Sequence, residues 1–170
     1  FPYLKELGAN ESTMGLSLMI GTLAEIPVLF FGNRLIQRFK AYGLLILAMA
    51  ITGLRLLLFA AADTPTLAVF FQLLNGLTFP AMWVAGVAYA DENAPAGMAA
   101  TAQGLFGAMV FGFGSAVGGL TGGPLLERLG GRGLYLVFGV AVLVTVAFVA
   151  LMQQRLQIEG GDHTHEGVRS

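Results

Sequence analysis

Five long runs of apolar residues dominate this sequence and strongly limit what the chain can fold into. They cover residues 14–33, 41–62, 66–90, 99–126 and 134–152, and the last three contain no charged residue. A helix needs about 20 mostly apolar residues to cross the hydrocarbon core of a bilayer. Helices in the core of a water-soluble protein rarely run this long without charge. We therefore predict an all-α membrane fold with these five runs as spans.

The composition supports the bilayer as a partner and excludes several other classes. Charged residues make up only 11% of the chain, whereas soluble domains carry about a quarter. The net charge is −1 and no basic patch with interleaved aromatics is present, so we expect no nucleic-acid partner. The chain has no cysteine, no phosphate-binding loop, no nucleophile elbow and no metal-binding histidine pair on a helix. We expect no enzyme, no cofactor and no metal site.

Short connections join the five runs, so neighbouring helices are expected to be antiparallel. The chain starts with Phe1, and residues 1–13 are interpreted as the end of a truncated helix and an outer loop. Residues 155–170 are polar and glycine-rich, which predicts a disordered tail. Lysine and arginine in the short loops favour the side that carries residues 34–40 as cytoplasmic. The prediction is a multi-pass protein of the cytoplasmic membrane, with its carboxyl terminus inside.

Two segments that each follow a span resemble one another. Residues 32–39 read GNRLIQRF and residues 122–129 read GGPLLERL, an offset of 90 residues. The two segments lie on opposite sides of the membrane in the predicted topology, which is typical of three-helix units repeated in inverted orientation. The same offset puts the first helix of the first unit upstream of Phe1. Chance similarity between two loops is the alternative.

Two charged residues interrupt the apolar runs, and charge inside a bilayer is costly, by about 2.5–3.5 kcal/mol on insertion scales. Glu25 lies about 16 Å and Arg55 about 10 Å from the outer ends of their helices, at about 1.5 Å per residue. We predict that they interact. In a functional reading Glu25 binds a proton and Arg55 is its switchable partner. In a structural reading the pair only joins two helices.

Polar and aromatic residues follow one side of the third run at three- and four-residue steps. They predict a substrate-facing wall or amide hydrogen bonds between helices, and the main candidates are Gln72, Asn75, Phe79 and Tyr89. The fourth run is rich in glycine, which favours a close-packing face, with a hinge as the alternative. Gln103 near its start is a candidate gate hydrogen bond or an interfacial residue.

Several short motifs together resemble a known family. They are YLKELGA at residues 3–9, EIP at 25–27, LR at 54–55, QLLNGLTF at 72–79 and TAQGL at 101–105. In order and spacing they are similar to the carboxyl-terminal half of major facilitator superfamily transporters. The branch that they resemble most holds the proton symporters grouped with lactose permease, nucleoside permeases and phenylpropionate permeases. Asn75 stands where relatives are expected to have a histidine.

The resemblance implies a fold and a function. The five runs would be spans eight to twelve of twelve, in a six-helix half, with an amino-terminal half completing the protein. The loop residues Arg38, Glu127 and Arg128 look like part of the superfamily's signature loops and join Gln103 as gate or loop candidates. The implied function is secondary transport of a small organic solute, coupled to protons, by alternating access. The alternative is a non-transporting membrane receptor or scaffold.

Overall fold

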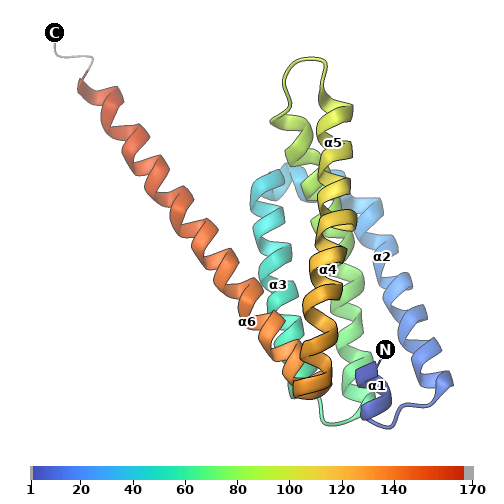
Figure 1. Cartoon of the computed structure of the whole chain (residues 1–170). Coiled ribbons are helices and arrows are strands. Elements are labelled where there is room, and N and C mark those ends of the chain that lie inside the picture. The colour runs from blue at the N-terminus through green and yellow to red at the C-terminus, as the bar shows by residue number, and fades with distance from the viewer. Residues whose placement is uncertain (1, 167–170) are drawn as a thin grey trace.

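The chain folds into a bundle of long helices, and this computed structural model describes residues 2–166 (Figure 1). No strand occurs in that described part. In chain order the elements are α1 (Pro2–Glu6), α2 (Glu11–Phe39), α3 (Ala41–Ala61), α4 (Pro65–Glu92), α5 (Ala99–Gly107), the π-helix η1 (Ala108–Phe113) and α6 (Gly114–Glu166). Helices α2, α3 and α4 and the segment Ala99–Arg155 are each long and apolar enough to cross a membrane.

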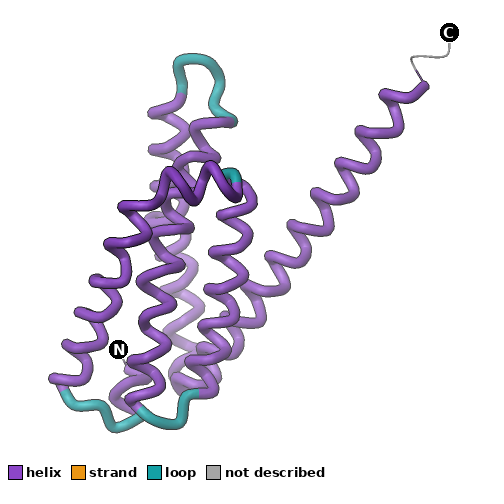
Figure 2. Tube along the Cα trace, turned by 180° about the vertical axis from the view of Figure 1, so that it is seen from behind, coloured by secondary structure: helices purple, strands orange, loops and turns teal. Residues whose placement is uncertain are grey.

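The long helices run alternately up and down, and α6 itself reverses direction (Figures 1 and 2). The reversal lies at Gly130, whose φ of 66° and ψ of −179° are not helical. We call residues 114–129 the first arm and residues 131–166 the second arm of α6. The first arm runs back along the bundle from α5, and the second arm diverges from the bundle. The two ends of the bundle are named here the Gly130 end, which holds α1, and the Lys40 end.

The helices follow the apolar runs closely where the local signals are strong. Helix α3 begins at residue 41 as predicted, and α4 begins at Pro65, after the Thr64 side chain that accepts a hydrogen bond from the Leu67 amide. Helix α2 is longer than the predicted span of residues 14–33. It starts after Asn10, whose carboxamide oxygen accepts from the Thr13 amide at 2.8 Å, and continues to Phe39. Polar turns at both ends therefore lengthen this helix beyond its apolar part.

Helix α4 occupies the middle of the bundle because glycines let α2 approach it closely. A Cβ atom added to Gly76 would overlap the carbonyl oxygen of Gly21 and lie 2.6 Å from the Cβ atom of Ala24. Further along, a Cβ atom on Gly32 would lie 3.2 Å from the Cγ1 atom of Val84. These contacts fall on the buried stripe of α2, which consists of Ser17, Gly21, Val28 and Gly32. The buried face of this helix is thus the face that packs on α4.

Helix α3 packs on the other side, between α4 and the second arm of α6. A Cβ atom on Gly53 would lie 2.8 Å from the Cδ2 atom of Leu143, and one on Gly139 would lie 2.7 Å from the Cδ2 atom of Leu57. Two helices that approach through glycines in this way gain dispersion contacts along their backbones, which is the usual source of association inside lipid.

A small core closes the Gly130 end of the bundle. Its buried members are Tyr3, Leu4, Phe59, Ala62 and Ala68. The Tyr3 hydroxyl donates a hydrogen bond of 3.0 Å to the carbonyl oxygen of Ala62. The short helix α1 is thereby fixed against the ends of α3 and α4, although it has only five residues.

Large apolar side chains cover much of the outer surface. Phe30 is 81% exposed and Leu120 is 78% exposed, and many others on α2, α4 and α6 are exposed to a smaller but substantial degree. Contiguous apolar surface of this extent is not stable against water and requires lipid or protein around it. The exposed surface therefore agrees with an all-helical membrane protein.

Breaks between helices recur at matching places in the chain. Lys40, between α2 and α3, has φ 58° and ψ 161°, close to the φ 66° and ψ −179° of Gly130. The other two residues with positive φ in the described part are Gly8 (84°) and Gly97 (80°). Gly8 lies three residues before the start of α2 at Glu11, and Gly97 lies two residues before the start of α5 at Ala99. The two pairs are separated by 90 and 89 residues, close to the offset of the two similar segments.

Lys40 is the only residue other than glycine with positive φ in the described part, so its replacement by glycine should stabilise the protein. This region of backbone space is essentially restricted to glycine and costs other residues about 1–3 kcal/mol. We expect Lys40→Gly to raise stability by about 1 kcal/mol after the entropy of the added glycine is subtracted. Thermal unfolding of the complete protein in detergent measures it. Lys40→Ala removes the same charge and should give no such gain, and equal gains would show that charge is responsible.

Only part of the glycine-rich fourth run packs on other helical segments within the described residues, where Gly107 approaches Trp83 and Gly122 approaches Phe138. Added Cβ atoms on Gly104, Gly112, Gly118, Gly119 and Gly123 would meet nothing within 4 Å. Instead, the helix widens into the π-helix η1 over Ala108–Phe113, and neither α5 nor η1 has a buried residue. A π-helical turn marks a local departure from regular hydrogen bonding, so the hinge interpretation of this run gains a structural basis.

The structure describes only part of the tail predicted at residues 155–170. The backbone of α6 is helical to Glu166, which differs from the disorder expected from residue 155 onward, while residues 167–170 lie outside the described residues.

Candidate functional site

Arg55 lies in the middle of α3 beside a cavity of about 240 Å³ at the Gly130 end. Its guanidinium carbon lies 5.5 Å from the centroid of the Phe59 ring. Its Nε atom is buried and has no hydrogen-bond partner in the described part of the chain. An arginine without a carboxylate partner in an apolar bundle is costly, which makes this residue the centre of the candidate site.

The cavity is assembled from four elements that are distant in sequence. Helix α1 supplies Tyr3 and Leu4, α3 supplies Arg55 and Phe59, α4 supplies Gln72 and Asn75, and the second arm of α6 supplies Tyr135. Three of the residues predicted from sequence, Arg55, Gln72 and Asn75, therefore share one cavity. No cluster of three or more potential metal ligands occurs in the part of the chain that was described.

The two amides reach the cavity because of the close contact between α2 and α4. Gln72 and Asn75 lie one helical turn apart and are both half-buried. The Gln72 Cγ atom lies 3.6 Å from the position of a Cβ atom on Gly21, so the absence of a side chain there leaves room for the glutamine. Each carboxamide offers both donors and an acceptor to a solute.

Aromatic rings form the apolar wall of the cavity. The ring of Tyr135 lies 5.4 Å from that of Tyr3 and 5.3 Å from that of Phe59, both in tilted arrangements. Rings at this spacing pack favourably on one another and hold their positions. The site therefore combines a cation, two amides and a rigid aromatic surface.

The predicted contact between Glu25 and Arg55 is wrong for this structure. The only ion pair between described residues joins Arg132 to Asp63, at 3.8 Å, and Glu25 is not among the residues that line the cavity. The physical reason is the position of α4. At this level α2 packs on α4 through Gly21 and Ala24 and not on its neighbour in sequence, α3. Glu25 is half-buried and lies one turn from both Gly21 and Val28, on the same side of α2.

Phe79 and Tyr89, the other two members of the predicted wall, do not line the cavity of Arg55. Phe79 is 38% exposed on α4, and Tyr89 is 40% exposed. The ring of Tyr89 lies 6.0 Å from that of Tyr42, in a separate apolar pocket between α3, α4 and α6. Residues spaced by three and four positions over 18 residues gradually turn around the helix axis. The two ends of this stripe on α4 therefore face two different pockets.

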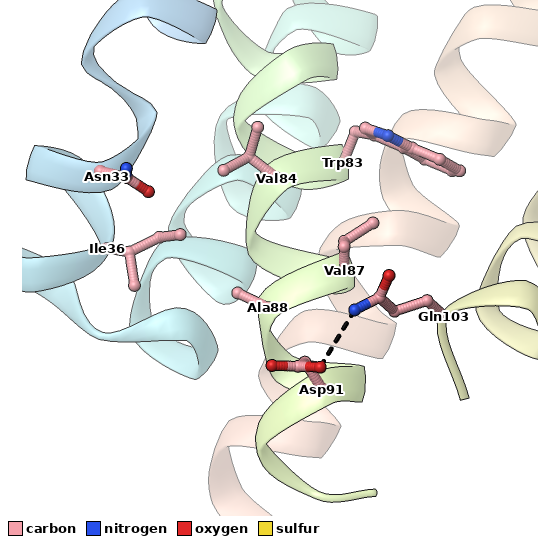
Figure 3. Close-up of a pocket in the computed structure, with 8 residues that line it drawn as sticks. All are labelled: Asn33, Ile36, Trp83, Val84, Val87, Ala88, Asp91 and Gln103. Carbon is pink, nitrogen blue, oxygen red and sulfur yellow. Dashed lines mark hydrogen bonds between the residues drawn. The ribbon is translucent and has the colours of Figure 1, made fainter. Parts of the chain in front are cut away.

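A second cavity, of about 320 Å³, lies at the Lys40 end between α2, α4 and α5 (Figure 3). Here the Gln103 side-chain amide donates a hydrogen bond of 3.0 Å to the Asp91 carboxylate, which joins α5 to α4. The Trp83 ring forms another wall and packs on Phe106 and Phe111. The predicted hydrogen-bonding position of Gln103 thus has a definite partner in the structure.

The remaining gate candidates are all exposed. The Arg38 guanidinium lies 5.7 Å from the centroid of the Phe39 ring, and Glu127 and Arg128 extend from the first arm of α6 near the kink. None of the three forms an ion pair with another described residue.

A hydrogen bond between α1 and α6 lies next to the reversal of α6 at Gly130. Both carboxylate oxygens of Glu6 accept from the Gly131 amide, at 3.2 and 3.0 Å. A Cβ atom on Gly131 would overlap the Tyr3 ring, so α1 packs directly on the backbone at this point. Sequence reasoning missed the roles of Glu6, Tyr3 and Tyr135. A weak signal was available for Tyr135, because it carries a hydroxyl group at the start of the last apolar run.

Comparison with known families decides the class of protein. The sequence matches the MFS_1 like family over residues 1–137, most of the chain. This chain belongs to that family. The match covers the helices that build both cavities, from α1 to the beginning of the second arm of α6. The resemblance to the major facilitator superfamily is thus confirmed.

Individual relatives agree with this assignment. The chain is 32% identical over 158 residues to the maltose permease of Geobacillus stearothermophilus, covering 92% of this chain and 40% of the permease. It is 26% identical over 156 residues to the major facilitator superfamily domain-containing protein 6-like protein B of Xenopus laevis, covering 92% of this chain and 25% of the relative. With the nucleoside permease NupG of Escherichia coli it shares 27% identity over 153 residues, covering 84% of this chain and 36% of the permease.

The chain therefore spans between a quarter and two fifths of the length of these curated relatives. No solved structure matches it significantly. Permeases for maltose and for nucleosides are among the relatives, and this member of the family is a multi-pass membrane protein.

Proposed function

We propose that this chain is the carboxyl-terminal half of a secondary transporter that moves a small organic solute across the cytoplasmic membrane by alternating access. Family membership supports it, as does the cavity where Arg55, Gln72 and Asn75 meet. Permeases for maltose and for nucleosides are among the relatives, and both kinds of solute are small organic molecules. The partner required is an amino-terminal half of the same protein.

The distribution of the two cavities favours alternating access. One cavity lies at the Gly130 end of α4 and the other at the Lys40 end, and both use side chains of α4. Transporters of this kind expose a site near the midplane first to one side and then to the other. The hydrogen bond between Gln103 and Asp91 would act as a gate at the cytoplasmic end, and Arg38, Glu127 and Arg128 would contact the other half.

Matching backbone breaks support five spans built on inverted three-helix repeats. In this proposal Lys40 and Gly130 are equivalent positions, as are Gly8 and Gly97. Gly130 would mark the outer boundary between two spans that α6 joins, and the carboxyl terminus would be cytoplasmic.

Glu25 is the proposed proton-binding residue. It is the only carboxylate within the predicted spans, and such groups in membrane helices mark ion pathways by default. Because Arg55 does not neutralise it here, coupling would require Glu25 to exchange its proton as α2 moves relative to α4.

The proposal predicts that Glu25→Gln abolishes the proton dependence of transport. Cells that express the complete protein should accumulate a transported solute, and an uncoupler should reduce that accumulation in wild type. In the variant the uncoupler should have no effect, because the amide cannot exchange a proton. Glu11→Gln, an exposed carboxylate at the start of the same helix, is the matched control and should retain the uncoupler effect. Full uncoupler sensitivity in Glu25→Gln would exclude Glu25 as the coupling site.

The second candidate is a non-transporting receptor or scaffold. The relatives named major facilitator superfamily domain-containing protein 6-like have no solute in their names. Membership of the family alone therefore does not require transport. The uptake experiment separates the two, since a receptor would bind a solute without moving it.

A further inference from the structure

The positive charge of Arg55 has no counterpart in its surroundings. The elements packed around it contribute two tyrosines, a phenylalanine, a leucine and two amides to the cavity, and no carboxylate. Inside a bundle that excludes water, an arginine in this position is strongly favoured to take an anionic partner.

The acidic residues nearest in the fold have other partners. The Glu6 carboxylate is held by the Gly131 amide, and Asp63 faces Arg132 at 3.8 Å near the same end of the bundle. Glu25 forms no ion pair with another described residue and is not among the residues that line the cavity. Among described residues the guanidinium is therefore available to a ligand.

We propose that the transported solute is a small organic anion and that Arg55 binds its carboxylate or equivalent oxyanion, with Gln72 and Asn75 as additional hydrogen-bond donors. This inference rests on the proposed transport function and specifies its substrate class. The planar guanidinium donates two parallel hydrogen bonds to a carboxylate, which gives both strength and orientation.

The remaining lining limits the rest of the solute. The rings of Tyr3, Phe59 and Tyr135 form an apolar surface beside the cation, which suits a flat or branched hydrocarbon part. The cavity of about 240 Å³ is the part of the site that this half of the proposed transporter supplies.

The test measures binding by the complete, purified protein in detergent. Thermal unfolding is followed with benzoate, acetate and phosphate at constant ionic strength, and with the neutral analogues benzamide and acetamide. We expect at least one of the anions to raise the unfolding temperature in a saturable way, and the neutral analogues to have no such effect. Arg55→Gln should weaken that anion's binding at least about tenfold, and Arg55→Lys should retain part of it because the charge remains.

Arg34→Gln is the matched control. Arg34 also lies over a phenylalanine ring, with its guanidinium carbon 5.5 Å from the centroid of Phe31, but it is exposed at the Lys40 end of α2. Its replacement should leave anion binding unchanged. If none of the three anions stabilises wild type more than the neutral analogues, or if Arg55→Gln binds them equally well, the proposal is overturned and a carboxylate of the protein itself neutralises Arg55.

A second experiment separates this inference from the transport proposal. Proteoliposomes that contain the complete protein are tested for uptake of benzoate, maltose and uridine. Uptake of a neutral solute that Arg55→Gln does not reduce overturns the anion proposal while transport stands. Saturable, Arg55-dependent benzoate binding without uptake of any solute supports the anion site and contradicts transport.

Discussion

Replacing Gly76 by leucine is expected to separate α2 from α4 and to destabilise the protein by about 3 kcal/mol or more. Overpacking a well-packed contact costs about 1–3 kcal/mol when flexible side chains can move aside. At Gly76 the nearest atom is the backbone carbonyl oxygen of Gly21, which cannot rotate away, and the Ala24 Cβ atom is 2.6 Å distant. The variant should also lose solute binding, because Gln72 is positioned by the same contact.

The measurement is the unfolding temperature and the size-exclusion profile of the complete protein in detergent. The control is Gly43→Leu, which inserts the same side chain into α3 at a position with nothing within 4 Å of an added Cβ atom. It should change stability by less than about 0.5 kcal/mol, as surface substitutions usually do. Equal losses in the two variants would mean that the contact of α2 with α4 is not as close as described.

The helical content of the chain was predictable because hydrophobicity alone decides it. Runs of about 20 apolar residues have no alternative in lipid to a helix that satisfies its own backbone. Helix ends were predictable where a cap or a proline marks them, as at Thr64 and Pro65. The longer extent of α2 was not, since its last two turns are polar and only the observed helix shows that they continue.

The pairing of helices could not be derived from the sequence. Short loops suggested that α2 and α3 pack together along their length, and on that basis Glu25 was expected to meet Arg55. The structure inserts α4 between them because Gly21 and Gly76 permit a closer approach than any pair of residues with side chains. The spacing of small residues on each helix indicates that the helix has a close-packing face. A single sequence does not indicate which two of these faces pack together.

The site was predicted in part. Polar residues inside apolar runs are costly, so Arg55, Gln72 and Asn75 were recognised from their type and position, and they share one cavity. Tyr3 and Tyr135 were not recognised, since their place in the cavity depends on how α1 and the second arm of α6 fold back. Contacts made across more than 100 residues of chain depend on tertiary structure and leave no periodic signal.

Gly130 is the position where a single methyl group should have the next largest effect. Its φ of 66° with ψ of −179° is essentially open to glycine alone, and an alanine there is strained by about 1–3 kcal/mol. Relief of that strain requires the two arms of α6 to change their angle, which would displace Tyr135 from the cavity and Gly131 from the Glu6 carboxylate. We therefore expect Gly130→Ala to lower both the unfolding temperature and the affinity for solute.

The matched control for Gly130→Ala is Gly123→Ala, which adds the same methyl group two turns earlier in the first arm. That position is helical and has nothing within 4 Å of an added Cβ atom, so alanine should be neutral or should stabilise by up to about 1 kcal/mol. Opposite signs for the two variants, measured by thermal unfolding of the complete protein, would assign the loss to backbone conformation. If Gly130→Ala were as stable as Gly123→Ala, the kink would be a flexible joint, and the orientation of Tyr135 would have to be fixed by the contacts of the second arm with α3 instead.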